Sequence, residues 1–478
     1  MAKLFIGVDI GTSSIKVAVV EVDPQGRALV TYHVSRSYPA GRQRDAGTWS
    51  QLARTMVAEL NPASAPAGIG FSGQMHSLIP LDEMRRSMSP TMLWCDMQGL
   101  PRLQRFVAEQ CPLSEFVERT GNLPLPDFTL AKWLYLRNEK PDLADGVRYL
   151  PSAKDYVRWT FDPGSDLITD PTDAAGTQVY NLFQQAWDPV LIKQAEIPAS
   201  ALGIILPSAQ VVGKADELNR QWAGTPLVNG AGDQAACGRA VGAGSPGQAS
   251  LSLGTSGVLA VSLAKTALPD GWTGDLHIFP GWQPDMYQVI ATIPALGSGL
   301  SWAASLLGVD LAALDDLARE GSEIDLGGEQ AGFFPFLDGM GAPNPDSTVR
   351  AAFYGLSSSM DRRVIAWIIY QGFAMEIRML VDAINAVGVD ISQVTLSGGA
   401  SQLPTFAAAI AAYLPVPCRR ASARAGSAVG AALIAADTVL GPNTAWLDSA
   451  ERIRAAARPM DPLWLARRSA HPKPWQFA

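Results

Sequence analysis

The sequence predicts an α/β protein built from two similar domains. A strand, a Gly-Thr-Ser turn and a second strand occur near the N-terminus, around Gly11 to Ser13, and again half a chain later, around Gly254 to Ser256. The 478 residues, 47% of them apolar, also exceed the size at which a single hydrophobic core stops growing. We therefore place one domain at residues 1–243 and the other at residues 244–478.

Each element follows from its local pattern. The first hairpin is predicted from two β-rich apolar runs, Leu4 to Val8 and Ile15 to Val22, on either side of a glycine-containing turn. Helices and further strands alternate along the rest of the chain, which indicates an α/β architecture. The expected helices are Phe128 to Lys140, Arg362 to Val387 and Ala425 to Ala436, and the expected strands include Ile69 to Ser72 and Gln393 to Thr395. Ala455 to Ala478 has no clear periodicity and is expected to be a surface-packed tail.

Composition narrows the class of protein. With 37 basic and 45 acidic residues the net charge is −8, so the chain lacks the basic surface that nucleic acids or anionic membranes attract. The uncharged stretch Ala240 to Ala264 contains Pro246 and several glycines, which favours a buried strand and loop over a membrane span. The cysteines are scattered without CxxC pairs, which argues against zinc and disulfides and favours the reducing cytoplasm; they are Cys95, Cys111, Cys237 and Cys418.

The first candidate site is the turn that begins at Asp9 and runs through Gly11, Thr12 and Ser13, with Lys16 shortly after it. Such a turn can direct backbone N–H groups and hydroxyls at phosphate oxygens, and a buried aspartate before it can orient a hydrated magnesium ion. An ordinary turn with a solvated aspartate would explain one copy equally well. The second copy, at Gly254 and Thr255, favours the phosphate interpretation.

Other nucleotide-binding motifs can be set aside. No Walker A sequence is present anywhere in the chain. One Gly-x-Gly-x-x-Gly match starts at Gly242, but it follows an expected helix, contains Pro246 and leads into a strand. A dinucleotide site needs the opposite context, in which the motif follows a strand and opens a helix.

The second candidate is Asp233, which follows an apolar strand and a glycine pair and stands at the start of an alanine-rich helix. The carboxyl ends of strands are where open α/β sheets place their sites, and a kinase needs a carboxylate to accept the proton of the attacking hydroxyl. The competing interpretation is an aspartate that only caps the helix.

Two further segments supply groups suited to small polar ligands. Gln74, Met75 and His76 follow a strand, and Trp94 and Asp96 come later, so that hydrogen-bonding groups and one flat ring gather as a polyol requires. A structural histidine and a core tryptophan are the alternatives. The tandem glycines before Ala400 permit a flat ring such as adenine to approach the backbone, although a plain strand-to-helix turn explains them too.

Together these segments resemble the FGGY carbohydrate kinases, relatives of actin and hexokinase, and among them the xylulokinase branch. The matching segments occur in order along nearly the whole chain: Asp9 to Ser13, Gly73 to His76, Leu93 to Asp96, Lys154 to Tyr156, Thr169 to Thr177, Gly230 to Asp233, Leu253 to Ser256 and Ser397 to Ala400. Each motif alone is weak, whereas their ordered agreement is specific.

The resemblance implies two ribonuclease H-like domains that flank a deep catalytic cleft, with ATP and Mg²⁺ between them and the sugar against the N-terminal domain. In the family's pattern Asp233 is the general base, Asp9 lies near the metal, and Asp96 lies near the sugar hydroxyls. The other implied contacts are Gln74, Met75, His76 and Trp94 for the sugar; Gly11, Thr12, Ser13, Lys16, Gly254 and Thr255 for the phosphates; and Gly297, Gly399 and Ala400 for the nucleoside. A homodimer is common among members.

The chain departs from the family pattern on the sugar side. Relatives usually carry Arg two residues after the Trp-x-Asp motif, where this chain has Gln98, and many show Gly-Glu-Arg where it has Gly339-Met340-Gly341. D-xylulose is the first expectation for the substrate, followed by another ketose such as ribulose or sedoheptulose, or an aldose. A non-catalytic nucleotide-binding protein of the actin-like superfamily is the alternative from another class.

Overall fold

The computed structural model describes residues 1–60, 65–216, 222–325, 331–341, 346, 348–422, 426–441, 446–447 and 451–453. The predicted tail, Ala455 to Ala478, lies outside these residues. The chain divides into two compact units, and each is assembled from separate stretches. The first comprises Met1–Pro246, Ser262–Val289 and Arg424–Asp448; the second comprises Gly247–Val261, Ile290–Ala423 and the described part of Ser449–Ala478.

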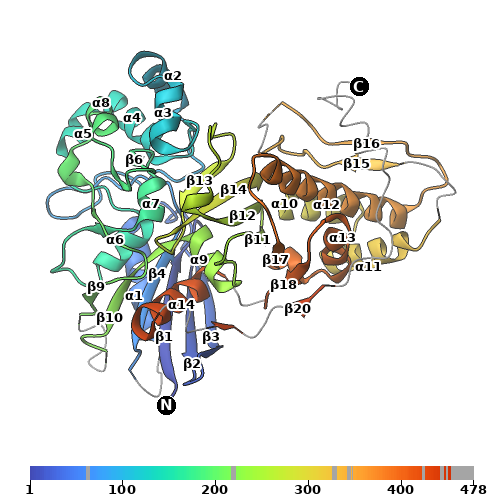
Figure 1. Cartoon of the computed structure of the whole chain (residues 1–478), viewed down its shortest axis with the longest axis horizontal. Helices are drawn as coiled ribbons and strands as arrows, with labels where there is room; N and C mark the ends of the chain where they lie inside the picture. Colours follow the sequence, from blue (N-terminus) through green and yellow to red (C-terminus); the bar gives the residue numbers. More distant parts are fainter. Residues whose placement is uncertain are drawn as a thin grey trace. The chain divides into compact units, whose positions relative to one another are not determined.

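The first unit is built around a seven-stranded sheet (Figure 1). Its strands, in spatial order, are β19 (Trp446–Leu447), β3 (Arg27–Ser37), β2 (Ser14–Val22), β1 (Lys3–Ile10), β4 (Gly68–Gly73), β10 (Pro226–Gly232) and β9 (Val211–Lys214). The predicted hairpin is confirmed, because β1 and β2 pair antiparallel from Lys3↔Val22 to Ile10↔Ile15. Strand β4 then pairs parallel with both β1 and β10.

Helices cover both faces of this sheet, and the period-2 alternation of β1 sorts its residues between them. Ile6, Val8 and Ile10 join the core that includes Trp49 of α1 (Ala46–Ala58) and residues of α6 (Ala153–Trp159). On the opposite face, α14 (Ser427–Leu440) lies against β1 and β4 and beside α9 (Asp233–Ala240), as Figure 1 shows. Gly7 permits this contact, because a Cβ there would stand 1.8 Å from the carbonyl oxygen of Ala428.

Further helices of the first unit lie in the long connection between β4 and β10. They are α2 (Leu100–Glu109), α3 (Leu113–Thr120), α4 (Thr129–Glu139), α5 (Pro141–Gly146), α7 (Pro171–Ala175) and α8 (Pro189–Gln194). The expected helix at Phe128 to Lys140 is therefore confirmed as α4. Short strands in the same region form two small ladders, β5 (Ile168–Thr169) with β8 (Ile204–Ile205) and β6 (Tyr180–Asn181) with β7 (Ala186–Trp187).

A second seven-stranded sheet repeats the local plan of the first. Its order is β13 (His277–Pro280), β14 (Met286–Ile293), β12 (Gly257–Ala264), β11 (Gln248–Leu253), β17 (Gln393–Ser397), β18 (Cys418–Arg420) and β20 (Glu451–Arg452). The antiparallel hairpin of β11 and β12 is followed in space by the parallel strand β17, as β1 and β2 are followed by β4. Two hairpins of one design, each beside a later parallel strand, confirm the predicted pair of ribonuclease H-like α/β folds.

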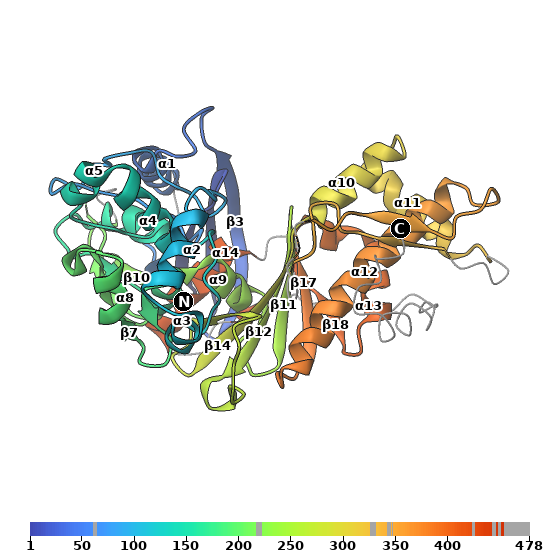
Figure 2. The same cartoon turned by 90° about the horizontal axis from the view of Figure 1, so that it is seen from above.

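The helices of the second unit gather on one side of β17 and β18 (Figure 2). They are α10 (Gly297–Leu306), α11 (Leu311–Ser322), α12 (Arg362–Ala386) and α13 (Pro404–Tyr413), and a short ladder of β15 (Gly332–Phe334) with β16 (Ala352–Tyr354) packs on α12. Helix α12 confirms the helix predicted at Arg362 to Val387. By length and composition it would also suit a membrane span, but 89% of its most apolar window is buried, as in a core helix.

Candidate functional site

The carboxyl ends of three neighbouring strands bring together residues that are far apart in sequence. Ile10 of β1 lies opposite Gly73 of β4, and Gly73 lies opposite Gly232 of β10. The backbone N–H of Gln74 donates to the carbonyl of Ile10 at 2.8 Å. The Asp9 turn, the Gln74 loop and Asp233 therefore share one edge of the sheet, as parallel pairing requires.

Asp9 is buried near the end of β1, on the face of the sheet that α14 covers. One carboxylate oxygen, Oδ2, accepts a hydrogen bond from Lys16 Nζ on the partner strand at 3.1 Å. The other, Oδ1, is buried and has no hydrogen-bond partner among the residues that the structure describes. The carboxylate raises the pKa of Lys16, which fixes that side chain as a cation. A buried anionic oxygen without a partner indicates that a ligand belongs there.

Asp233 is the first residue of α9 and follows β10 directly. It is thus one position inside the helix, and Gly232 takes the capping position that the competing interpretation gave to Asp233. Burial, followed by repulsion from the nearby Asp9, raises the pKa of the Asp233 carboxyl to about 7. A carboxylate with this pKa can accept a proton from a substrate hydroxyl near neutral pH.

The turn after β1 is connected to two predicted sugar-binding residues by one hydroxyl. Thr12 Oγ1 donates to Gln74 Oε1 at 3.1 Å and accepts from the indole N–H of Trp94 at 3.0 Å. Gln74 Nε2 is buried without a partner among the described residues, so its N–H groups are available to a ligand. The carbonyl of Gly11 is held by the hydroxyl of Tyr38 at 2.8 Å, a contact that the sequence gave no sign of.

Met75 and His76 form a tight loop beside β10. The Met75 sulfur lies 2.7 Å from the point where a Cβ on Gly232 would stand, so a side chain there would displace Met75. His76 has a left-handed backbone (φ 66°), and its ring packs on Phe128 at 4.3 Å between centroids. Burial lowers the pKa of His76 to about 4, so the ring is neutral at pH 7. Since Nδ1 lies 3.0 Å from the carbonyl oxygen of Gly176 and must donate to it, Nε2 is left as an acceptor.

Asp96 lies in the same loop as Trp94, but its carboxylate is held by protein groups. Arg44 Nη2 donates to Oδ1 at 2.8 Å, Arg44 Nη1 pairs with Oδ2, and the N–H of Leu93 donates to Oδ2 at 2.7 Å. Arg44 could not be predicted from the sequence, because it lies in a polar segment without periodicity, 52 positions before Asp96. The Asp96 carboxylate, which is predicted to lie near the sugar, is therefore one partner of an ion pair.

A buried ionic cluster supports the backbone around the site. Lys154 Nζ, which is fully buried, lies 2.6 Å from Asp155, 3.0 Å from Asp170 and 3.2 Å from Asp173. Asp170 caps α7, whose Thr172 Oγ1 accepts from the N–H of Gly232 at 2.8 Å. The cluster and α7 therefore fix the chain directly before Asp233.

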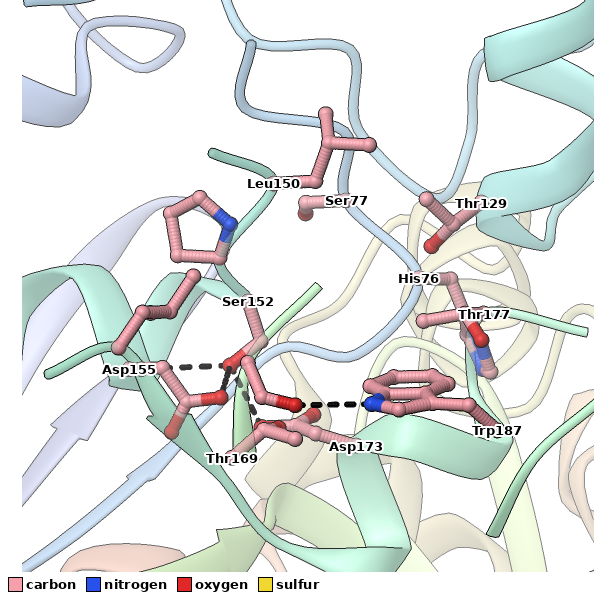
Figure 3. Close-up of a pocket in the computed structure, with 13 residues that line it drawn as sticks. His76, Ser77, Thr129, Leu150, Ser152, Asp155, Thr169, Asp173, Thr177 and Trp187 are labelled. Carbon is pink, nitrogen blue, oxygen red and sulfur yellow. Dashed lines mark hydrogen bonds between the residues drawn. The ribbon is translucent and has the colours of Figure 1, made fainter. Parts of the chain in front are cut away.

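A small cavity lies beside this cluster (Figure 3). The centre of a water molecule can occupy about 20 Å³ of it. Figure 3 shows Ser152 within hydrogen-bond distance of Asp155 and Asp173, with His76 and Trp187 also in the lining. This space suits one water molecule and is too small for a sugar. The cavity therefore belongs to the support of the site.

In the second unit, the predicted nucleotide-binding residues also lie together. The N–H of Gly297 donates to the carbonyl of Gly254 at 2.9 Å, and the N–H of Ser298 donates to that of Thr255 at 3.1 Å. A Cβ on Gly297 would stand 2.2 Å from the oxygen of Gly254, so the start of α10 can approach the turn only because residue 297 is glycine. The loop with Gly399 and Ala400 follows β17, the parallel neighbour of β11.

Comparison with known proteins finds relatives that match along nearly the whole chain. Xylulose kinase of Escherichia coli (strain K12) is 28% identical over 442 residues, which cover 91% of this chain and 89% of the relative. Xylulose kinase of Bacillus subtilis (strain 168) is 27% identical over 467 residues, which cover 94% of this chain and 90% of the relative. Both matches extend through the two units, so the similarity is not confined to one motif.

Solved structures show the same fold. A "xyloylose kinase" from Brucella ovis superposes with a TM-score of 0.84 at 26% identity, covering 99% of this chain and 97% of the other. Xylulose kinase from Rhodospirillum rubrum gives a TM-score of 0.84 at 23% identity with the same coverage. The models for the N-terminal and C-terminal domains of the FGGY family of carbohydrate kinases match residues 4–238 and 249–438. The chain therefore belongs to the FGGY family of carbohydrate kinases, enzymes that phosphorylate sugar hydroxyls.

Proposed function

We propose that this carbohydrate kinase transfers the terminal phosphoryl group of ATP to D-xylulose and forms D-xylulose 5-phosphate, with Asp233 as the general base. The observation that carries the proposal is the carboxyl of Asp233, held at the carboxyl end of β10 with a pKa of about 7. The xylulose kinases among the relatives support the choice of sugar. Localisation in the cytoplasm and a homodimeric state are part of the same proposal.

In the proposed mechanism the first unit binds the sugar. The free N–H groups of Gln74, the Nε2 acceptor of His76 and the face of Trp94 contact the sugar hydroxyls and carbon chain. Asp233 removes the proton of the attacking hydroxyl as the bond to phosphorus forms. Positioning and charge stabilisation then supply most of the catalysis, because phosphoryl transfer requires little covalent participation by the protein.

Phosphate binding is assigned to the two Gly-Thr-Ser turns. Their backbone N–H groups and the hydroxyl of Thr255 are suited to phosphate oxygens, whereas the hydroxyl of Thr12 would first have to leave Gln74. Lys16, already held as a cation by Asp9, adds a positive charge beside the first turn. The nucleoside is assigned to Gly297 and to the loop of Gly399 and Ala400, where a side chain on Gly399 would meet nothing within 4 Å.

The residues present fit a magnesium ion that is held mainly by the nucleotide. Among the described residues no group of three or more His, Cys, Asp or Glu could hold a metal by itself. Asp9 nevertheless offers a buried oxygen without a partner, and Mg²⁺ commonly binds through one or two carboxylates, phosphate oxygens and water. When bound, the ion would neutralise charge on the phosphates. Asp9 would hold it and keep Lys16 oriented.

A coupled ADP-release assay tests the proposal. Purified protein with ATP and Mg²⁺ is assayed against D-xylulose, D-ribulose, sedoheptulose, aldoses and polyols, in parallel with Asp233→Asn. We expect D-xylulose to stimulate turnover by orders of magnitude, and the variant to lose about 10²–10⁴-fold in kcat, as for removal of a general base. Stronger stimulation by another ketose would correct the substrate alone. No stimulation by any sugar would favour the non-catalytic alternative.

A further inference from the structure

The ion pair of Arg44 and Asp96 differs from an ordinary surface salt bridge in its geometry. The guanidinium and the carboxylate face each other through two parallel contacts, Nη1 with Oδ2 and Nη2 with Oδ1. The same Nη1 donates to the carbonyl of Thr91 at 3.3 Å, and the N–H of Thr91 donates to the carbonyl of Arg44 at 2.9 Å. Both the backbone and the side chain of Arg44 are thus held against the segment that leads to Trp94.

The ion pair of Arg44 and Asp96 keeps N–H groups that can donate to a ligand, but few carboxylate positions that can accept from one. Asp96 uses three of its lone-pair positions, two on Arg44 and one on the N–H of Leu93. Arg44 uses both N–H groups of Nη1 and one of Nη2, so that Nε–H and one Nη2–H have no partner among the residues that the structure describes, and 45% of its side chain is exposed. A ligand at this pair therefore meets N–H donors from Arg44 more readily than oxygen acceptors from Asp96.

The pair lies next to the proposed sugar-binding residues. Asp96 is two positions after Trp94, whose indole N–H donates to Thr12, and Thr12 donates to Gln74. The pKa of Asp96 is lowered chiefly by Arg44, which confirms that the carboxylate is anionic. Where the family pattern has an arginine two residues after the Trp-x-Asp motif, this chain has the neutral Gln98, so Arg44 is the guanidinium found at this loop.

The charge of the surroundings favours a neutral partner for Arg44. Its positive charge is balanced by Asp96, and the nearby Lys132 is balanced by Asp127, which acts on it electrostatically. A carboxylate on the ligand would gain little from such a neutral environment. A keto oxygen is neutral, has two lone pairs and carries no proton, so it fits the remaining N–H donors.

We propose that Arg44 is a substrate-binding residue that donates to the keto oxygen of a ketose, and that it distinguishes ketoses from the corresponding polyols. The inference rests on the proposed function and specifies its substrate class. A site whose donors are set for one oxygen binds an analogue less tightly when that analogue places its oxygen in another direction, because the hydrogen bond is then weakened or lost. A polyol places a tetrahedral hydroxyl where the ketose has a planar carbonyl.

The test compares steady-state kinetics of wild type, Arg44→Gln and Arg44→Lys, with Arg42→Gln as the matched control. Arg42 is an exposed arginine two positions away, paired with Asp45. The readouts are KM for D-xylulose, KM for ATP, the inhibition constant of xylitol against D-xylulose, and Tm. In wild type we expect xylitol to bind at least about tenfold more weakly than D-xylulose.

Arg44→Gln should raise KM for D-xylulose by roughly 10- to 100-fold, the range expected on losing a hydrogen bond to a charged donor, and should change xylitol inhibition much less. Arg44→Lys should be intermediate, and Arg42→Gln should match wild type. If wild type is active, three results would each overturn this inference alone. The first is equal affinity of wild type for xylitol and D-xylulose, and the second is an unchanged KM of Arg44→Gln for D-xylulose. The third is a parallel rise in the KM for D-xylulose and in the inhibition constant of xylitol, together with a lowered Tm. Wild type inactive with every ketose would overturn the proposed function, and this inference with it.

Discussion

Ionisation of Asp233 is required for its proposed role as general base but lowers its contribution to stability. The raised pKa of about 7 means that, between about pH 4 and pH 7, the folded protein retains a proton that the unfolded chain has already released. Unfolding then releases a proton, so a rise in pH through this window lowers the contribution of Asp233 to stability. The ionised form that destabilises the fold is the form that a general base requires.

This conflict predicts two effects at one residue. In wild type, kcat/KM should fall by roughly tenfold per unit as the pH drops below about 7. In Asp233→Asn, activity is lost but the cost of the buried charge disappears, so Tm should exceed that of wild type at pH 8 and approach it at pH 5. Initial-rate pH profiles and thermal melts at the two pH values measure both. A rate that stays constant down to pH 5, or a variant less stable at pH 8, would contradict the assignment.

Which site residues the sequence predicted depends on where their signals lie. Asp9, Thr12 and Asp233 were found because each stands beside glycines at the end of an apolar strand, a pattern contained within ten residues. Arg44 was missed because its role arises only when a distant loop is brought to it. The family resemblance implied that Asp96 lies near the sugar but could not show that a guanidinium occupies two of its lone-pair positions.

At the scale of elements, α14 determines where α9, and with it Asp233, lies on the sheet. Gly430 of α14 rests on the backbone of Ala236 in α9, and a Cβ there would stand 1.8 Å from the carbonyl oxygen. Ser427 donates to the carbonyl of Asp233 at 3.2 Å, and the buried pair of Arg239 and Asp437 joins the same two helices. The helix contact thus fixes the position of Asp233, the proposed general base.

Gly430→Ala should therefore be destabilising, although alanine is the better helix former. The intrinsic gain in helix propensity is about 1 kcal/mol, whereas overpacking against backbone atoms costs roughly 1–3 kcal/mol and displaces α9. We expect a lower free energy of unfolding in urea together with reduced kcat. The control is Gly164→Ala, where the Cβ would approach nothing closer than 4.0 Å. If Gly430→Ala were as stable as wild type or more stable, α9 and α14 would accommodate the added methyl group at no cost, and the prediction would be contradicted.

The long elements were predictable and the short ones were not. Both hairpins and helices α4, α12 and α14 follow from apolar periodicity and from turn residues. Helix α7 has only five residues, too few for a periodic signal, yet its Thr172 holds Gly232 and its C-terminal Gly176 holds His76. Its capping Asp170 appeared in the sequence only as part of a family motif.

At the scale of the whole molecule, the sequence revealed the repeat but not the path of the chain. Two Gly-Thr-Ser hairpins predicted two similar folds, and the sheets share the arrangement of a hairpin beside a later parallel strand. Residues Ser262–Val289 and Arg424–Asp448 nevertheless group with the first unit. These later segments join the first unit through long-range packing, which local sequence patterns do not encode.

The most direct test of the central claim is ³¹P NMR of the protein incubated with ATP, Mg²⁺ and D-xylulose. We expect a new phosphomonoester resonance, coupled to the protons of a CH₂ group, that grows in step with ADP and is absent with Asp233→Asn. Release of inorganic phosphate alone, or a phosphomonoester that forms equally well with the variant, would contradict it. Release of inorganic phosphate alone would show that this sugar is not phosphorylated. Equal product formation by the variant would show that Asp233 is not the general base.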